Sequence, residues 1–193
     1  MRDEHPASII LASASPRRRQ LLAEAGYEFT VVVPDLDESA FEAEGIEAGE
    51  YARKLALAKA NSVAHAYPDR LVVGADTVVD FEGTIIGKPA DAEDAERITR
   101  KLFSAPHKVV TGLAIVRLCD DTRLLESDST AIYPRPLTGG QIAKHISCGS
   151  WRGKAGAYAI KEVGDEFIER IEGSLTNVMG LPMERLKSLL SGL

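Results

Sequence analysis

Short apolar runs alternate with segments of helical periodicity along nearly the whole chain of 193 residues. Apolar runs of this length are typical of buried strands. They cover residues 8–11, 29–33, 71–73, 77–80, 109–118, 130–133 and 165–171. Because helical segments separate most of these runs, the sequence predicts an α/β fold with a mostly parallel or mixed sheet.

Local capping signals place the starts of the intervening helices. A small polar residue followed by proline, or by an acidic or amide residue three positions later, is typical of a helix N-terminus. Such signals occur at Ser15-Pro16, at Asp91 with Asp94 and at Thr138 with Gln141, and Pro182 opens a last helix. An alanine-rich stretch over residues 50–66 predicts a long helix. Neither a repeat nor a long linker divides the sequence, so we expect one domain over residues 1–193, with two lobes at most.

Composition excludes several classes of protein. The 23 lysines and arginines against 29 aspartates and glutamates give a net charge of −6, which disfavours binding to nucleic acid. The two cysteines, Cys119 and Cys148, lack metal-ligand or C-x-x-C spacing, which favours a reducing compartment. Apolar stretches fall short of the ~18 residues of a membrane span, and the run over residues 9–12 is too short for a signal peptide. We therefore expect a cytoplasmic protein with neither a nucleic-acid nor a membrane partner.

Three arginines, Arg17, Arg18 and Arg19, follow the helix-start signal Ser15-Pro16. The N-terminus of a helix already carries positive charge, so cations there are locally unfavourable. An anion among the free N–H groups and guanidiniums removes this penalty, and a polyphosphate suits the site. The alternative is a basic turn that is merely solvated.

A single carboxylate, Asp76, interrupts the apolar residues between 71 and 79. A buried carboxylate must be paired, hydrogen-bonded, bound to a metal or placed at an open strand end facing a cleft. Gly74 favours the strand end. The alternative is an aspartate that caps a turn between two strands.

Three further carboxylates follow the second apolar run, namely Asp35, Asp37 and Glu38. Acidic clusters of this size are usually solvated loops. Together with Asp76, however, they provide the oxygen ligands that a hard divalent cation prefers and often shares with substrate phosphates.

Two lysines lie in unusual positions. Lys59 interrupts the apolar face of the predicted helix over 50–66, so it either extends along the edge of the core or points into a cleft. Lys88 lies between a glycine and a proline, where a ligand can approach the backbone. A single histidine before a strand, His107, is more often structural or exposed than catalytic.

Several common nucleotide-binding and hydrolase motifs do not occur in the sequence. Neither G-x-x-x-x-G-K-[ST], nor G-x-G-x-x-G, nor G-x-S-x-G appears, which excludes the P-loop, Rossmann and nucleophile-elbow classes. Nor does either cysteine have a histidine in an identifiable catalytic motif. Metal-assisted hydrolysis therefore fits the acids and bases better than a covalent mechanism does.

The order and spacing of the motifs resemble those of the Maf family over residues 11–182. The motifs are Leu11-Ala-Ser-Ala-Ser-Pro-Arg-Arg18, Asp35-Leu-Asp-Glu38, Gly74-Ala-Asp-Thr77, Gly87-Lys-Pro89, His107 through Gly112, Lys154-Ala-Gly-Ala-Tyr158 and Asn177-Val-Met-Gly-Leu-Pro182. Maf proteins are nucleoside triphosphate pyrophosphatases that are similar in fold to the inosine triphosphate pyrophosphatases. The resemblance implies an elongated α/β structure with a central mixed sheet flanked by helices, a cleft between two lobes, and a homodimer.

The resemblance also implies a reaction and a set of site residues. The reaction is hydrolysis of a nucleoside triphosphate to the monophosphate and pyrophosphate, serving the nucleotide pool. Asp76 would be general base or metal ligand and Glu38 a metal ligand, with magnesium as the expected cation and manganese or cobalt as substitutes. The residues that match the family's phosphate-binding and charged cleft positions are Ser13, Arg17, Arg18, Glu38, Lys59, Asp76 and Lys88.

Substrate preference within the family follows two branches, one acting on dTTP and UTP and the other on 7-methyl-GTP. Arg17, Thr77 and the motif over 154–158 resemble the first branch, so dTTP and UTP are the expected substrates. One departure is Lys161, where that branch has a glutamine thought to touch the base. An amide both donates and accepts hydrogen bonds whereas an ammonium only donates, so the base preference is relaxed or altered if Lys161 reads the base.

Two other functions remain open at this stage. The chain could be a regulator of cell division that senses nucleotide without turnover, in which case its effect would survive Asp76→Asn. It could also transfer a phosphoryl or nucleotidyl group, but nothing in the sequence supplies an acceptor site.

Overall fold

The computed structural model describes residues 9–158 and 167–193, which form a seven-stranded mixed sheet. Its strand order is β2-β1-β3-β5-β6-β7, with β4 paired to β3. The pairs of β1 with β2 and with β3 are parallel, and the other pairs are antiparallel. The strands are β1 (Ile9–Ala12), β2 (Phe29–Val32), β3 (Val72–Phe81), β4 (Thr84–Ile86), β5 (His107–Arg117), β6 (Thr122–Pro134) and β7 (Ile168–Glu172).

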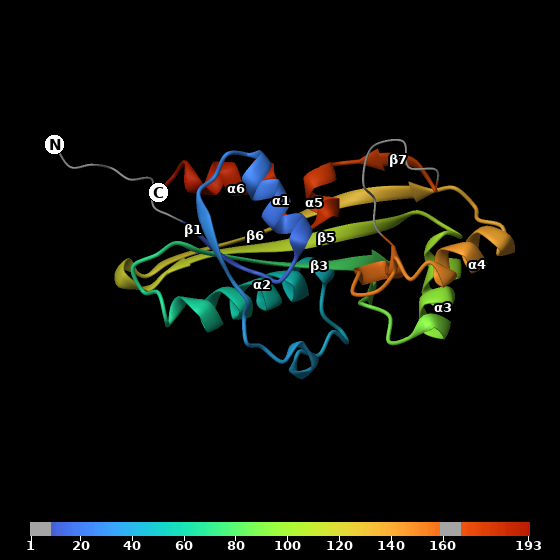
Figure 1. Ribbon diagram of the computed structural model, residues 1–193, viewed down its shortest axis with the longest axis horizontal. Helices are drawn as coiled ribbons and strands as arrows, with labels where there is room; N and C mark the ends of the chain where they lie inside the picture. The colour runs from blue at the N-terminus through green and yellow to red at the C-terminus, as the bar shows by residue number, and fades with distance from the viewer. Residues whose placement is uncertain (1–8, 159–166) are drawn as a thin grey trace.

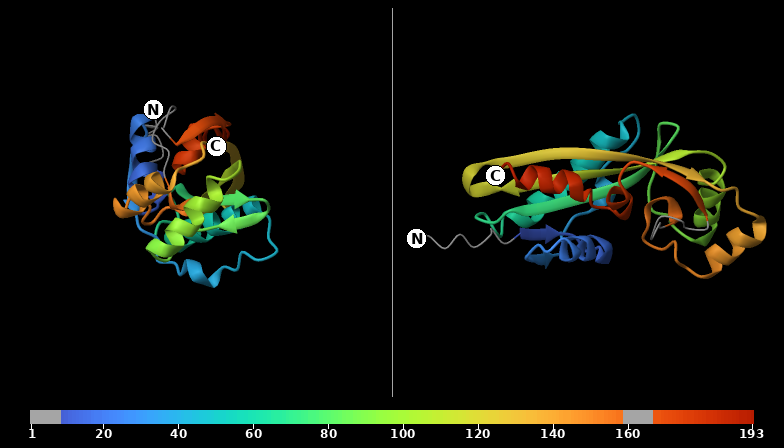
Figure 2. Two further views of the ribbon diagram at one scale, coloured as in Figure 1. Left: turned by 90° about the vertical axis from the view of Figure 1, so that its right-hand side faces the viewer. Right: turned by 90° about the horizontal axis from the view of Figure 1, so that it is seen from above.

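Helices cover both faces of this sheet, and the molecule is elongated along β5 and β6 (Figure 1). The helices are α1 (Pro16–Glu24), α2 (Ala48–Ala64), α3 (Ala92–Leu102), α4 (Gly139–Ser147), α5 (Leu175–Met179) and α6 (Met183–Leu190). One core cluster joins α1 and α6 to one face, and another joins α2 to the opposite face. At the far end, α3, Trp151 and Tyr158 enclose a third cluster, which forms a second lobe seen from above in Figure 2. Among the described helices, none is long and apolar enough to cross a membrane.

The predicted α/β class is confirmed, and helices begin at each of the predicted start signals. Asp91 accepts a hydrogen bond from the backbone N–H of Asp94, and Thr138 with Gln141 forms a complete capping box at the start of α4. Ser15 stands at the N-cap of α1, but its side chain makes no capping hydrogen bond. The first turn of α1 therefore lacks the local acceptor that usually satisfies its N–H groups.

One predicted interruption is wrong: the two apolar runs around Asp76 belong to a single strand, β3. Asp76 lies opposite Gly112 of β5, so it neither caps a turn nor ends its own strand. The opening comes from the neighbouring strands instead. Pairing with β1 stops at Gly74 and pairing with β4 begins at Val79, so in these pairings residues 75–78 have a partner strand only on the β5 side. This gap lies next to the carboxyl end of β1, where α/β folds commonly bind ligands.

Other strand boundaries also differ from the sequence predictions. Strand β6 begins at Thr122 rather than at residue 130. Its first half is mainly polar and gave no strand signal in the sequence, and pairing with β5 holds it in the sheet. Short elements such as β4 and α5 give too weak a pattern to be predicted. The run predicted over 165–171 corresponds to β7, and its residues 165 and 166 lie outside the described residues.

Two glycines allow α2 to lie close against the sheet. A Cβ atom added at Gly112 would lie 2.2 Å from the backbone carbonyl oxygen of Ala52, and one added at Gly74 would lie 2.3 Å from that of Ala56. Small residues on the facing side of α2 complete the contact. The same helix face carries Lys59 over β3, so this close approach brings Lys59 to Asp76.

The close approach predicts a strong effect of Gly112→Ala. The added methyl group would overlap the α2 backbone, which has no rotamer with which to move away. We expect a loss of about 3 kcal/mol in the free energy of unfolding, measured by urea denaturation. Gly140→Ala is the matched control, because nothing lies within 4 Å of a Cβ atom added there and its stability should stay the same or rise. Equal stability of both variants would contradict this account of the helix contact.

Candidate functional site

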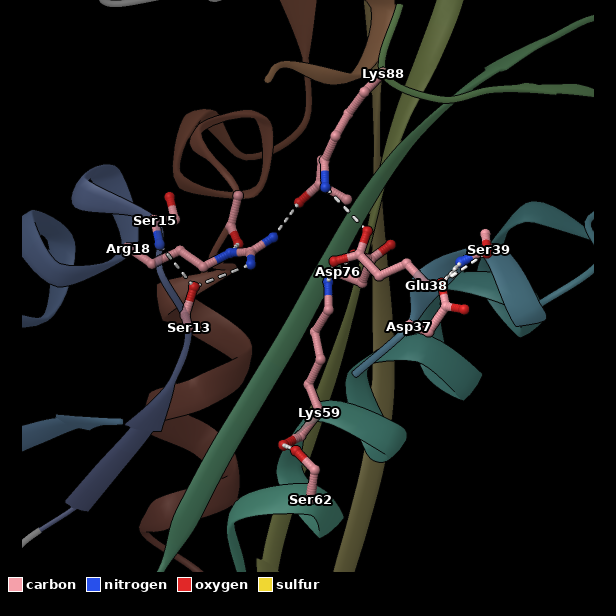
Figure 3. Close-up of polar contacts among 12 residues, drawn as sticks. Ser13, Ser15, Arg18, Asp37, Glu38, Ser39, Lys59, Ser62, Asp76 and Lys88 are labelled. Carbon is pink, nitrogen blue, oxygen red and sulfur yellow. Dashed lines mark hydrogen bonds and ion pairs between the residues drawn. The ribbon is translucent and has the colours of Figure 1, made fainter. Parts of the chain in front are cut away.

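A cleft of about 890 Å³ lies where the gap in the sheet meets the second lobe. It is lined from one lobe by the start of α1 and by α2, and from the other by the segment over 152–155 and Tyr158. The cleft gathers the eight described residues that the family resemblance assigned to the site, and Figure 3 shows most of them together. These residues are Ser13, Arg17, Arg18, Glu38, Lys59, Asp76, Thr77 and Lys88. The remaining one, Lys161, lies outside the described residues.

Asp76 and Lys59 form a buried ion pair at the floor of this cleft. Each residue is 6% exposed, and Lys59 Nζ donates to Asp76 Oδ1 at 2.6 Å. A carboxylate buried in mid-strand would be costly alone, and so would an ammonium on the apolar face of a helix. Each therefore explains how the other is tolerated, and Lys59 points into the cleft rather than along the edge of the core.

Glu38 joins this pair to a third charged residue. It lies at the start of a short 3₁₀ segment, Glu38–Ala40, and its Oε1 atom accepts from Lys59 Nζ at 2.8 Å. Its Oε2 atom accepts from the exposed Lys88 at 2.9 Å. Although desolvation alone raises the pKa of Glu38, hydrogen bonds from the two lysines lower it to about 2. Glu38 is therefore ionised at every physiological pH.

The predicted acidic cluster is only partly present in the cleft. Asp37 accepts hydrogen bonds from the backbone N–H and hydroxyl of Ser39 and caps the short 3₁₀ segment. Neither Asp35 nor Asp37 lines the cleft. The solvated-loop interpretation therefore holds for these two residues, and Glu38 alone of the three joins Asp76.

Arg18 is held by three neutral acceptors. Its Nε atom donates to the carbonyl oxygen of Gly180 at 2.7 Å, Nη1 to Ser13 Oγ at 3.3 Å and Nη2 to Thr77 Oγ1 at 3.1 Å. Desolvation lowers the pKa of Arg18, and the charge of Asp76 opposes this shift. A guanidinium has five N–H groups, so two remain for a ligand in the cleft.

Arg17 lines the cleft beside Arg18, and desolvation also lowers its pKa. Arg19 is exposed and lies outside the lining residues. Among the described residues, no carboxylate forms an ion pair with Arg17 or Arg18. The first turn of α1 contains no acidic residue either. Within the described part of the chain, the start of α1 thus presents two arginines to the cleft without an ion-pair partner.

The opposite wall adds residues that sequence reasoning did not assign. Arg152 lines the cleft and its guanidinium lies over the Trp151 ring, 5.0 Å from the ring centroid. Lys154 lines the cleft as well, and only its place in a family motif could have indicated this. Gly180 was missed because a backbone carbonyl gives no sequence signal.

His107 has a structural role. The sequence favoured a structural or an exposed histidine over a catalytic one. It is buried, and its Nε2 atom lies 2.6 Å from the hydroxyl of Tyr158. Desolvation lowers the pKa of His107, which favours the neutral ring. The pair anchors Tyr158 at the side of the cleft.

Comparison with known proteins agrees with this geometry. The chain matches the family model described as Maf-like protein over residues 8–193. It belongs to the Maf family. Among its relatives, the dTTP/UTP pyrophosphatase of Geotalea uraniireducens (strain Rf4) is 45% identical over 177 residues, covering 92% of this chain and 90% of that protein. The dTTP/UTP pyrophosphatase of Symbiobacterium thermophilum is 40% identical over 183 residues, covering 95% of this chain and 92% of that protein.

Solved structures of Ham1 proteins share the fold of this Maf protein. The Staphylococcus aureus Ham1 protein matches with a TM-score of 0.56 at 13% identity, over 96% of this chain and 98% of that one. The Coxiella burnetii HAM1 protein gives 0.55 at 12% identity, over 96% and 99% of the two chains. At this identity the likeness concerns the fold alone, and it confirms the predicted α/β architecture with a central mixed sheet.

The two lysine partners of Glu38 in this Maf protein make its ionisation testable. Its folded pKa of about 2 lies below the usual 4.5, so ionised Glu38 stabilises the folded state above pH 4.5. This contribution is lost as the pH falls from 4.5 to about 2. In Lys88→Met, loss of one partner should raise the pKa of Glu38 towards 4.5, measured by carboxyl ¹³C NMR in chelator-treated protein.

Arg97→Met is the control for this titration. Arg97 pairs with Asp94 on the exposed side of α3 and does not line the cleft. Its loss should leave the pKa of Glu38 at about 2. If Lys88→Met gave the same value as this control, Lys88 would not be a partner of Glu38 in solution.

Proposed function

We propose that this Maf protein hydrolyses dTTP and UTP to the nucleoside monophosphate and pyrophosphate. The observation that carries the proposal is that Arg17 and Arg18, which form no ion pair with any described carboxylate, line one cleft together with the buried Asp76. Such a cleft suits a polyphosphate beside a carboxylate that can accept a proton. The dTTP/UTP pyrophosphatases at 40–45% identity over most of the chain support the choice of substrate.

The cations divide into two groups with different tasks. Arg17 and Arg18, with the free N–H groups at the start of α1, bind phosphate oxygens and supply positive charge that no described carboxylate pairs with. Lys59 and Lys88 already bind carboxylates, so they hold Glu38 and Asp76 in place and offer further charge to the phosphates. Charge that develops on the leaving pyrophosphate is stabilised by groups already oriented before the reaction.

Asp76 is the proposed general base. A water molecule attacks the α-phosphorus, its proton passes to the Asp76 carboxylate, and the bond from the α-phosphorus to the bridging oxygen breaks. Pyrophosphate leaves with the electron pair of that bond. The Lys59 ammonium, which donates to Asp76 Oδ1 at 2.6 Å, holds the carboxylate in place beside the attacking water.

Glu38 and Asp76 would also hold the divalent cation that the family implies. Their carboxylates lie close to each other, because both accept from the same Lys59 Nζ atom. The described residues contain no cluster of three or more histidine, cysteine or acidic side chains suited to a metal. Magnesium fits a site with only the two carboxylates of Glu38 and Asp76, since it commonly binds one or two carboxylates and completes its coordination shell with water and substrate phosphates. When bound it would neutralise phosphate charge, and manganese or cobalt should substitute in vitro.

A nucleotide panel with Asp76→Asn tests this function. With magnesium, the wild-type protein should release pyrophosphate from dTTP and UTP, and a chelator should abolish the release. Asp76→Asn should lower kcat by about 10³-fold while the fold persists, because Glu38 still pairs with Lys59.

Asp80→Asn is the matched control for this panel. Asp80 lies on the same strand, accepts a hydrogen bond from the backbone N–H of Gly83 and does not line the cleft. It should keep wild-type kinetics. If no triphosphate released pyrophosphate although the protein was folded, the hydrolase would be excluded and a non-catalytic nucleotide sensor would be favoured.

Lys161 carries the prediction on base preference. We propose that it reads the base where the related pattern has glutamine. Lys161→Gln should then raise the kcat/KM of dTTP and UTP relative to the other triphosphates, since an amide can pair with both donors and acceptors of a pyrimidine. An unchanged ranking of substrates would show that this side chain does not read the base.

The family resemblance also supports a homodimer in the cytoplasm. Cys119 and Cys148 are exposed and unpaired, in keeping with a reducing compartment. Sedimentation equilibrium of the purified protein measures the oligomeric state directly.

A further inference from the structure

A line of hydrogen bonds runs from Arg18 away from the cleft and into the sheet. Arg18 Nη2 donates to Thr77 Oγ1 at 3.1 Å, and Thr77 Oγ1 lies 3.0 Å from Thr111 Oγ1. Thr111 Oγ1 in turn lies 2.9 Å from the backbone carbonyl oxygen of Asn177, to which it donates. Thr77 and Thr111 are direct partners across β3 and β5. Thr111 is fully buried and does not line the cleft.

Counting protons gives this line a single direction. A carbonyl oxygen only accepts, so the one proton of the Thr111 hydroxyl goes to Asn177. The bond between the two hydroxyls must then use the proton of Thr77. Thr77 Oγ1 consequently meets Arg18 as an acceptor, which is what a guanidinium requires because it only donates.

The far end of the line is fixed within the core. The buried Asn177 side chain donates from Nδ2 to the carbonyl oxygen of Val109 and to Thr130 Oγ1, each at 2.9 Å. Its Oδ1 atom has no hydrogen-bond partner, so its two donor contacts alone hold the amide. Helix α5 is thereby tied to β5 and β6. The carbonyl oxygen of Gly180, directly after α5, is the acceptor for Arg18 Nε.

We propose that Thr111 is a positioning residue, which acts through the Thr77 hydroxyl to hold the Arg18 guanidinium towards the triphosphate. The proposal rests on the proposed function for its substrate. It also assigns a role to Thr77: with its proton given to Thr111, the hydroxyl is an acceptor for Arg18 and is not available to donate to a nucleobase.

Loss of the Thr111 hydroxyl should disturb Arg18 without removing any group that lines the cleft. In Thr111→Val the Thr77 hydroxyl loses its acceptor, and the proton is then free to turn towards Arg18, where two donors would meet. A misplaced phosphate ligand costs binding and rate together, so we expect kcat/KM for dTTP to fall by about 10- to 100-fold. Thr111→Ser keeps the hydroxyl and should restore wild-type values.

The experiment compares Thr111→Val, Thr111→Ser and Thr99→Val. Thr99 is the matched control because it is equally buried, and its hydroxyl donates to Ala95 within α3, outside the cleft. Calorimetric binding of inorganic pyrophosphate is measured beside dTTP turnover, so that the test does not depend on catalysis. We expect weaker pyrophosphate binding in Thr111→Val alone, and wild-type binding in the other two variants.

The outcomes distinguish failure of the Thr111 proposal from failure of the proposed hydrolase function. Wild-type binding and turnover in a folded Thr111→Val protein would overturn it, and so would failure of Thr111→Ser to rescue. If neither the wild type nor any of the variants hydrolysed dTTP, the proposed function would be wrong. Pyrophosphate binding would still test the role of Thr111.

Proton NMR of the wild-type hydroxyls provides a second measurement that needs no variant. We expect slowly exchanging hydroxyl protons on both Thr77 and Thr111, with the Thr77 proton close to Thr111. A Thr77 proton that exchanged freely with water would overturn the proposal even if Thr111→Val failed to fold.

Discussion

The arrangement of the site depends on the ion pairs that the buried Lys59 ammonium makes with Asp76 and Glu38. This ammonium allows a carboxylate to lie in the middle of β3, and it draws the loop that carries Glu38 against the sheet. Lys59 can reach both acids only because Gly74 and Gly112 let α2 lie close to the strands. The close packing of α2 on the sheet and the position of the Lys59 charge therefore depend on the same small residues.

The two sides of the cleft differ in how their charge is balanced. On the α2 side, Lys59 and Lys88 form ion pairs with the carboxylates of Glu38 and Asp76, so their charges are balanced within the group. On the α1 side, Arg17 and Arg18 have no acidic partner among the described residues, and Arg18 is oriented by neutral oxygens instead. Neutral acceptors orient a guanidinium without cancelling its charge, which leaves that charge available to an anionic ligand.

The sequence predicted those features that local chemistry decides. The caps of α3 and α4 depend on residues three positions apart, and the arginines at the start of α1 conflict with the helix dipole in a way visible in the sequence. The division of β3 at Asp76 was wrong because the partner that makes this residue tolerable is Lys59, on another element. Thr111 escaped notice for a similar reason: threonine is common in strands, and only the cross-strand partner Thr77 reveals its use.

The short stretch of β3 over residues 75–78, which in the described pairings has a partner strand only on the β5 side, has a consequence for solubility. An open strand edge is a template on which another chain can add a strand, and proteins commonly guard such edges with charged side chains. In this protein the charged side chains at the open edge are Arg18 and Lys88, which line the same cleft. The two cations proposed to bind the triphosphate thus also oppose strand addition at this open edge of β3, so selection on either property acts on both.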